Sequence, residues 1–215
     1  MIFRIVSIIT ITAAIIYVLR KLKTLKISHK ELWLLTKQDF GENLINVWRE
    51  KSVSIFQKTK SAVAYICAIL FLILFITSFP PVVFGYHMSG LLMMLHVQAA
   101  LLMSAAIVFL VFLHSSGSQL SLEKLSKLYE DIKSQESLDS QIMLRVLFWL
   151  NIVFMLPAML SIILMLYPLF GTEGLEFLAD VHRWSVLLLT ISLIFVQYFR
   201  IVLISAGKAK GVYNV

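Results

Sequence analysis

The sequence is poor in cysteine, in glycine and in charge. Cys67 is the single cysteine, so the chain cannot close an internal disulfide or hold zinc or an iron–sulfur cluster by cysteine alone. Only 14% of the residues are charged, which excludes the charged surface of an ordinary soluble domain. The eight glycines form no phosphate-cradling loop. The apolar runs contain no acidic pair, so a proton-coupled transporter is not indicated.

Apolar residues make up 60% of the chain, and the mean hydropathy is +0.89, as in an integral membrane protein. Five runs are long enough to cross a hydrocarbon core of roughly 30 Å as helices, and they lie near 3–19, 61–79, 89–113, 146–168 and 182–205. The first run lacks a strongly basic start and a small-residue cleavage site, which indicates a retained anchor. We therefore predict an all-α fold, in which 1–60 is an anchor helix with a cytoplasmic interfacial segment and 61–215 is a four-helix membrane bundle.

The net charge of +7 follows the membrane and gives no indication of nucleic-acid binding. Seventeen of the nineteen Lys and Arg residues lie in 20–60, 114–145 and 200–215, and only Arg4 and Arg183 lie elsewhere. By the positive-inside rule these three segments are cytoplasmic. The sequence thus predicts a multi-pass inner-membrane protein with its N-terminus outside and its C-terminus in the cytoplasm.

Shorter signals concern the connecting segments. Ser28 and Glu31 have the spacing of a capping box at the start of a helix. Pro80 and Pro81 are expected to end the second span. The segment 169–181 is expected to be an outer loop, either solvated or docking a lysine-bearing partner through its acidic residues, Glu173, Glu176 and Asp180. The helical stripe over 125–132 is explained by a short solvated helix.

Four histidines lie in or beside the apolar runs. His96 and His114 are eighteen residues apart, so they share one helix face about 27 Å apart, and His87 lies on the opposite face. His182 opens the last span, which runs in the same direction as the third, so His96 and His182 both lie toward the outer side. Two facing imidazoles in a helix bundle are suitable axial ligands for the iron of a flat macrocycle. The alternative is that they bond neighbouring helices, and that His114 and His87 are solvated at the membrane boundaries.

Three short stretches resemble the membrane cytochrome b subunits of respiratory oxidoreductases, the group that includes formate dehydrogenase and thiosulfate reductase membrane subunits. They are 90–97, 167–174 and 181–184, with the sequences GLLMMLHV, YPLFGTEG and VHRW, in a resemblance that covers roughly 61–205. The resemblance implies a four-helix bundle with one or two b haems. It also implies that the chain is an electron-transfer subunit and is not catalytic alone.

By this resemblance His96 and His182 are the iron ligands of an outer-side haem. A second haem would use His114, but Gln197 stands where such proteins often carry a further histidine, so we expect one haem. His87 is a further candidate ligand through another helix pairing.

Partners and rival functions follow from the same residues. The implied partners are membrane lipid, quinone and a redox subunit such as a multihaem cytochrome c or an iron–sulfur protein, in a hetero-oligomer. Two alternative places for a quinone are the outer loop and the neighbourhood of three residues, Arg145, Trp149 and Asn151. The rival functions are a haem-free membrane anchor or scaffold of such a complex and a small transporter or channel component, the latter opposed by the scarcity of intramembrane charge.

Overall fold

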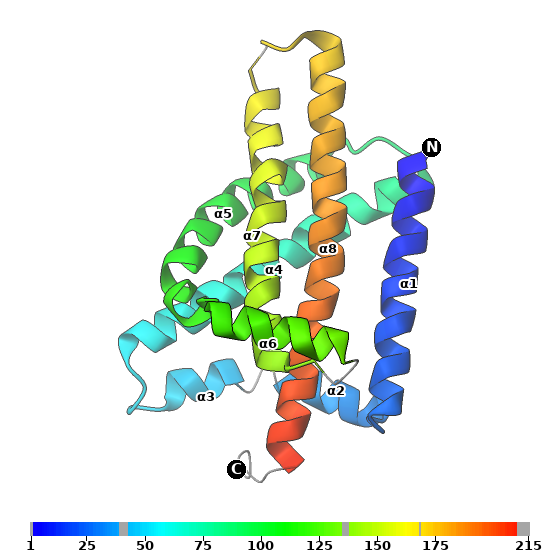
Figure 1. Cartoon of the computed structure of the whole chain (residues 1–215). Helices are drawn as coiled ribbons and strands as arrows, with labels where there is room; N and C mark the ends of the chain where they lie inside the picture. Colours follow the sequence, from blue (N-terminus) through cyan, green and yellow to red (C-terminus); the bar gives the residue numbers. More distant parts are fainter. Residues whose placement is uncertain (1, 39–42, 135–137, 168, 210–215) are drawn as a thin grey trace. The chain divides into compact units, whose positions relative to one another are not determined.

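The chain folds into helices connected by short segments (Figure 1). The structure, a computed structural model, describes residues 2–38, 43–134, 138–167 and 169–209. Within these residues the regular elements are all helical. The long helices are α1 (Ile2–Thr24), α4 (Ile55–Phe84), α5 (Gly90–His114), α7 (Ser140–Met165) and α8 (Gly171–Ala209). The short helices are α2 (His29–Lys37), α3 (Asn43–Arg49), α6 (Leu122–Lys133) and a 3₁₀ turn, Ser116–Ser118.

Each of the five long helices is long and apolar enough to cross a membrane. The prediction of an all-helical, multi-pass membrane protein with five spans is therefore confirmed, and the exposed apolar side chains of these helices contact lipid. Helices α1, α4 and α8 extend beyond the predicted apolar runs, α5 is shifted from its run by one residue, and α7 begins six residues earlier and ends three residues earlier than predicted. The extreme case is α8, whose 39 residues amount to about 58 Å of helix, roughly twice the thickness of the hydrocarbon core.

The prediction that Pro80 and Pro81 end the second span is wrong. Helix α4 continues through both prolines to Phe84 and closes at Gly85, whose φ of 74° is left-handed and whose N–H donates to the Pro81 carbonyl at 2.8 Å. Each proline removes one backbone donor. Ending the helix in lipid would leave several backbone groups without partners, which costs more.

The acidic segment predicted as an outer loop is also helical. Helix α8 begins at Gly171, where a φ of 58° turns the chain, so Glu173, Glu176 and Asp180 lie in its first three turns. Negative charge near a helix N-terminus is stabilised by the macrodipole, which explains why this sequence continues as a helix. Asp180 also pairs with Arg183 one turn further on, at 2.9 Å.

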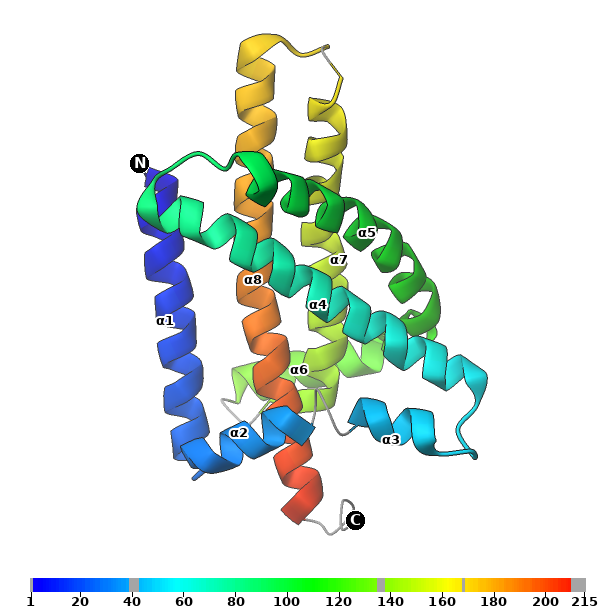
Figure 2. The same cartoon turned by 180° about the vertical axis from the view of Figure 1, so that it is seen from behind.

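The described residues divide into two compact units, and the predicted division at residue 60 stays a prediction. The first unit contains α3, α4, α5 and the first turns of α1 up to Ile8. Figures 1 and 2 show α4 and α5 side by side as an antiparallel hairpin. The buried side chains of this unit include Cys67 and Leu70 on α4 and Ala99 and Met103 on α5.

The second unit contains the α7–α8 hairpin, α6, α2 and α1 from Ile9 onward. Its best-buried apolar cluster joins Leu22 at the end of α1, Leu35 on α2 and Ile201 near the end of α8. The predicted capping box fixes the start of α2, because the Glu31 carboxylate accepts from the Ser28 N–H at 2.9 Å and the Ser28 hydroxyl from the Glu31 N–H at 3.2 Å. That prediction is confirmed.

Candidate functional site

In the first unit, His96 on α5 is held by α4. Thr77 is buried, with 4% of its surface exposed, and its Oγ1 lies 2.9 Å from Nδ1 of His96. The same oxygen lies 2.9 and 3.0 Å from the carbonyl oxygens of Ile73 and Leu74, which can only accept. A hydroxyl has one proton, and once that proton is donated to a carbonyl, Nδ1 of the imidazole is the donor. The lone pair of the neutral ring is then on Nε2.

In the second unit, His182 on α8 is held by α7 in the same manner. Its Nδ1 lies 2.9 Å from the carbonyl oxygen of Ala158, a residue that is only 3% exposed. Because a carbonyl only accepts, Nδ1 carries the proton and Nε2 carries the lone pair. A histidine that ligates a metal usually donates its second ring N–H to a carbonyl, carboxylate or water, which fixes the tautomer and the ring orientation.

The two hydrogen bonds lie at similar distances from the C-terminal ends of α4 and α7. Thr77 is seven residues before the end of α4 at Phe84, and Ala158 is seven residues before the end of α7 at Met165. At about 1.5 Å per residue, each contact is about 10 Å from the turn that closes its hairpin. Along the second helix of each hairpin the positions differ, because His96 is six residues after the start of α5 at Gly90 and His182 is eleven residues after the start of α8 at Gly171.

His114 and His87 differ from this pair. His114 is the last residue of α5, and its Nδ1 lies 3.2 Å from the Leu110 carbonyl of its own helix, so no second helix orients it through that bond. His87 is exposed and lies in the 86–89 connection before α5 begins. His96 and His182 instead are bonded through Nδ1 to a second helix.

Buried polar groups accompany the α7–α8 hairpin. Three side-chain atoms have no hydrogen-bond partner among the described residues: Asn151 Oδ1, Ser192 Oγ and Gln197 Nε2. Gln197, the residue expected to replace a second ligand, is thus a buried amide with an unpaired donor. Buried polar atoms without partners are costly, so a further polar group beside α7 and α8 would stabilise these three side chains.

Two of the three residues considered for a quinone are engaged elsewhere. The Arg145 guanidinium donates to the Gln119 carbonyl at 3.2 Å, and the Trp149 indole N–H donates to the Ser118 carbonyl at 2.8 Å. They fasten the segment that leads into α6. Asn151, with its unpaired oxygen, is the remaining member of that set.

Across residues 2–209, apart from the gaps given above, no cluster of three or more His, Cys, Asp or Glu side chains has the arrangement of a metal-ion site. A macrocycle that already supplies four nitrogen ligands needs only one or two axial side chains, and paired histidines satisfy that demand. The donor chemistry of His96 and His182, neutral rings with Nε2 as acceptor, fits haem iron.

Thr77 and Ala158 were not foreseen from the sequence. Thr77 is one of many hydroxyls in apolar runs, and its significance depends on the register of α4 against α5. Ala158 acts through its backbone, which leaves no signal in a sequence. A comparison of the chain with protein-family models, with curated proteins and with solved structures finds no match.

Proposed function

We propose that this chain is a membrane subunit that binds haem b and relays electrons between the quinone pool and a redox partner subunit of a respiratory complex. The observation that supports the proposal is that each hairpin orients one imidazole through a hydrogen bond between its Nδ1 atom and the other helix of the hairpin.

His96 and His182 would hold the iron through Nε2. When bound, the haem supplies reversible one-electron chemistry within the apolar layer. The chain keeps each ring in one tautomer: the Thr77 hydroxyl accepts from His96, and the Ala158 carbonyl accepts from His182. Donation from Nδ1 also makes Nε2 more basic, which strengthens a ligand bond.

The rest of the relay lies outside this pair. The chain is not catalytic alone, so oxidation or reduction of a substrate would take place on a partner such as a multihaem cytochrome c or an iron–sulfur protein. The positive-inside bias puts the paired histidines near the outer face of an inner membrane, with the C-terminus in the cytoplasm. A partner that docks beside the acidic first turns of α8 would approach from that outer face.

The test is a reduced-minus-oxidised absorbance spectrum, with haem quantification, of the full chain purified in detergent. We expect b-type bands in the unaltered chain and loss of most haem in His96→Ala and in His182→Ala. His29→Ala is the matched control, because His29 is an exposed histidine at the start of α2. It should retain the haem of the unaltered chain.

The outcome that contradicts the proposal is an unaltered chain without haem bands when it is produced with sufficient haem. That result would favour the haem-free anchor, in which the two histidines only join the helices of each hairpin. Equal haem in all four proteins would also contradict the assignment of His96 and His182, because the iron would then use other ligands.

A further inference from the structure

Helix α6 has an apolar face that the described residues leave uncovered. The apolar residues of α6 recur at helical spacing, so they share one face. Four of them are well exposed, with exposed fractions of 86% for Leu122, 41% for Leu125, 63% for Tyr129 and 60% for Ile132. A helix at the surface of a protein normally turns its polar face to water and buries its apolar stripe. The solvated helix expected from the sequence therefore does not explain why these four apolar side chains are exposed.

Helix α6 is attached to α7, so the exposure of its apolar face does not result from a detached helix. The Lys127 ammonium pairs with the Asp139 carboxylate, which caps the start of α7, at 3.0 Å. The chain that enters α6 is fixed to the first turns of α7 by Arg145 and Trp149 through the carbonyls of Gln119 and Ser118. Helix α6 is therefore held at the level where α7 begins.

Helix α2 provides a contrast within the same unit. It is similarly short and amphipathic, but its Leu35 is only 5% exposed and packs with Leu22 and Ile201. The described residues thus cover the apolar stripe of α2 and leave that of α6 exposed. An occupant other than these residues is needed for α6.

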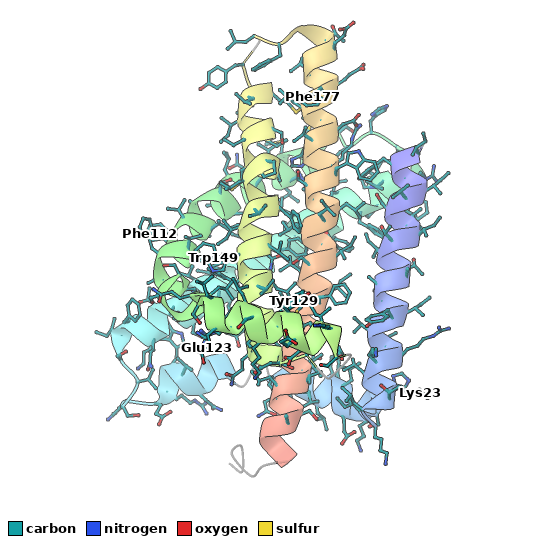
Figure 3. The ribbon with its side chains drawn as sticks, viewed as in Figure 1. Lys23, Phe112, Glu123, Tyr129, Trp149 and Phe177 are labelled. Atoms are coloured by element: carbon teal, nitrogen blue, oxygen red, sulfur yellow. The ribbon has the colours of Figure 1, made fainter. Side chains whose placement is uncertain are left out.

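The position of α6 identifies that occupant. Only short connections separate α6 from the end of α5 at His114 and from the start of α7 at Ser140, so both of its ends stay close to one membrane surface. Figures 1 and 2 show α6 running crosswise to α7 near the start of that span. In Figure 3, Tyr129 lies on the side of α6 toward which α7 rises, and Glu123 lies on the opposite side. A helix so placed directs its apolar face at the bilayer.

We propose that α6 lies in the plane of the membrane interface, with Leu122, Leu125, Tyr129 and Ile132 inserted among the lipid headgroups and upper acyl chains. At 100° per residue, Lys124 and Lys133 lie on the two borders of this face, where their stems can reach along the surface. Glu123, Glu130 and Asp131 lie away from the centre of the face and balance the three lysines of α6. The insertion therefore depends on apolar contact, with little contribution from net charge.

The experiment places an environment-sensitive nitrobenzoxadiazole label at single cysteines of the full chain, reconstituted in phosphatidylcholine vesicles. The background is Cys67→Ala, which removes the one native cysteine. Leu125→Cys and Ile132→Cys probe the apolar face, and Glu123→Cys and Glu130→Cys are matched controls on the same helix.

We expect labels at 125 and 132 to emit at shorter wavelength, to be quenched by shallow spin-labelled lipid, and to be several-fold less sensitive to aqueous iodide than labels at 123 and 130. Adding phosphatidylglycerol should change little, because the charges of α6 balance. Equal iodide quenching at all four positions would overturn the proposal in favour of a solvated helix. Protection of 125 and 132 from both quenchers would overturn it in favour of a protein partner on this face.

Discussion

Replacing Thr77 by valine tests the orientation of His96 without touching a ligand. Valine keeps the branched shape of threonine and removes the hydroxyl that lies 2.9 Å from Nδ1 of His96. The imidazole would then lose a hydrogen-bond partner at a site where Thr77 is only 4% exposed. The fixed tautomer would be lost with it.

The magnitude follows from the cost of a buried donor without a partner, about 1–3 kcal/mol. At 1.4 kcal/mol for each factor of ten, this corresponds to haem binding that is about 5- to 150-fold weaker. Loss of a comparable hydrogen bond behind a metal ligand typically weakens metal binding by about 10- to 100-fold. We therefore expect a dissociation constant for haem raised by about one to two powers of ten.

The assay is titration of haem into the haem-depleted chain in detergent, followed by the absorbance of the ligated haem. Thr190→Val is the control, because Thr190 is comparably buried at 6% exposed and its hydroxyl bonds only to the Val186 carbonyl of its own helix. Thr77→Ser keeps the hydroxyl and should restore tight binding. The reasoning is refuted if Thr77→Val binds haem as tightly as the unaltered chain, or if Thr77→Ser is as weak as Thr77→Val.

Three further predictions concern the other residues described above. His114→Ala should leave haem content unchanged in the quantified spectrum, and a loss of half the haem would reveal a second site. Gly85→Ala and Gly171→Ala should each lower thermal stability, followed by circular dichroism, by about 1–2 kcal/mol for a left-handed residue. The φ values of these two glycines are 74° and 58°. A methyl group at Gly85 would also meet the guanidinium end of the Arg4 side chain, which is flexible. A much larger loss of stability at Gly85 would show that Arg4 cannot move away. The Lys127 ammonium lowers the pKa of Asp139, so the attachment of α6 should be intact at neutral pH and weaken as the pH falls through that lowered pKa. A spin label at Ser126→Cys, in the Cys67→Ala background, should report this loosening while Asp139 is present. With Asp139→Asn, which keeps the cap but not the charge, the acid step should be absent.

The five spans could be predicted because membrane insertion depends on apolar length, a property that a sequence displays directly. The capping box at Ser28 was equally accessible, since both of its residues lie within one turn. Predictions that relied on local residue preference alone failed at Pro80 and Glu173. At Pro80 the environment makes ending the helix more costly than continuing it, and at Glu173 the acidic side chains favour a helix start.

The candidate site was only half accessible from the sequence. A histidine in an apolar run is conspicuous, so His96 and His182 could be named. Their partners depend on how two helices are shifted along each other, and Thr77 and Ala158 are 19 and 24 residues away in the chain. The tautomer of each ring, and with it the nitrogen that offers a lone pair, follows from that shift and not from the residue type.

The cluster that joins Leu22 and Leu35 to Ile201 also has a consequence for biosynthesis. The residues that Leu35 packs against come partly from the last span, which leaves the ribosome about 166 residues later. At about 5–20 residues per second, that delay is roughly 8 to 30 s. During this time the apolar side of α2 has contacts from α1, such as Leu22, but lacks those from the last span, such as Ile201. The first helices thus enter the membrane early, but their packing is complete only when the last span has been synthesised. The N-terminal quarter of the chain is therefore the part most exposed to misassembly and proteolysis during synthesis.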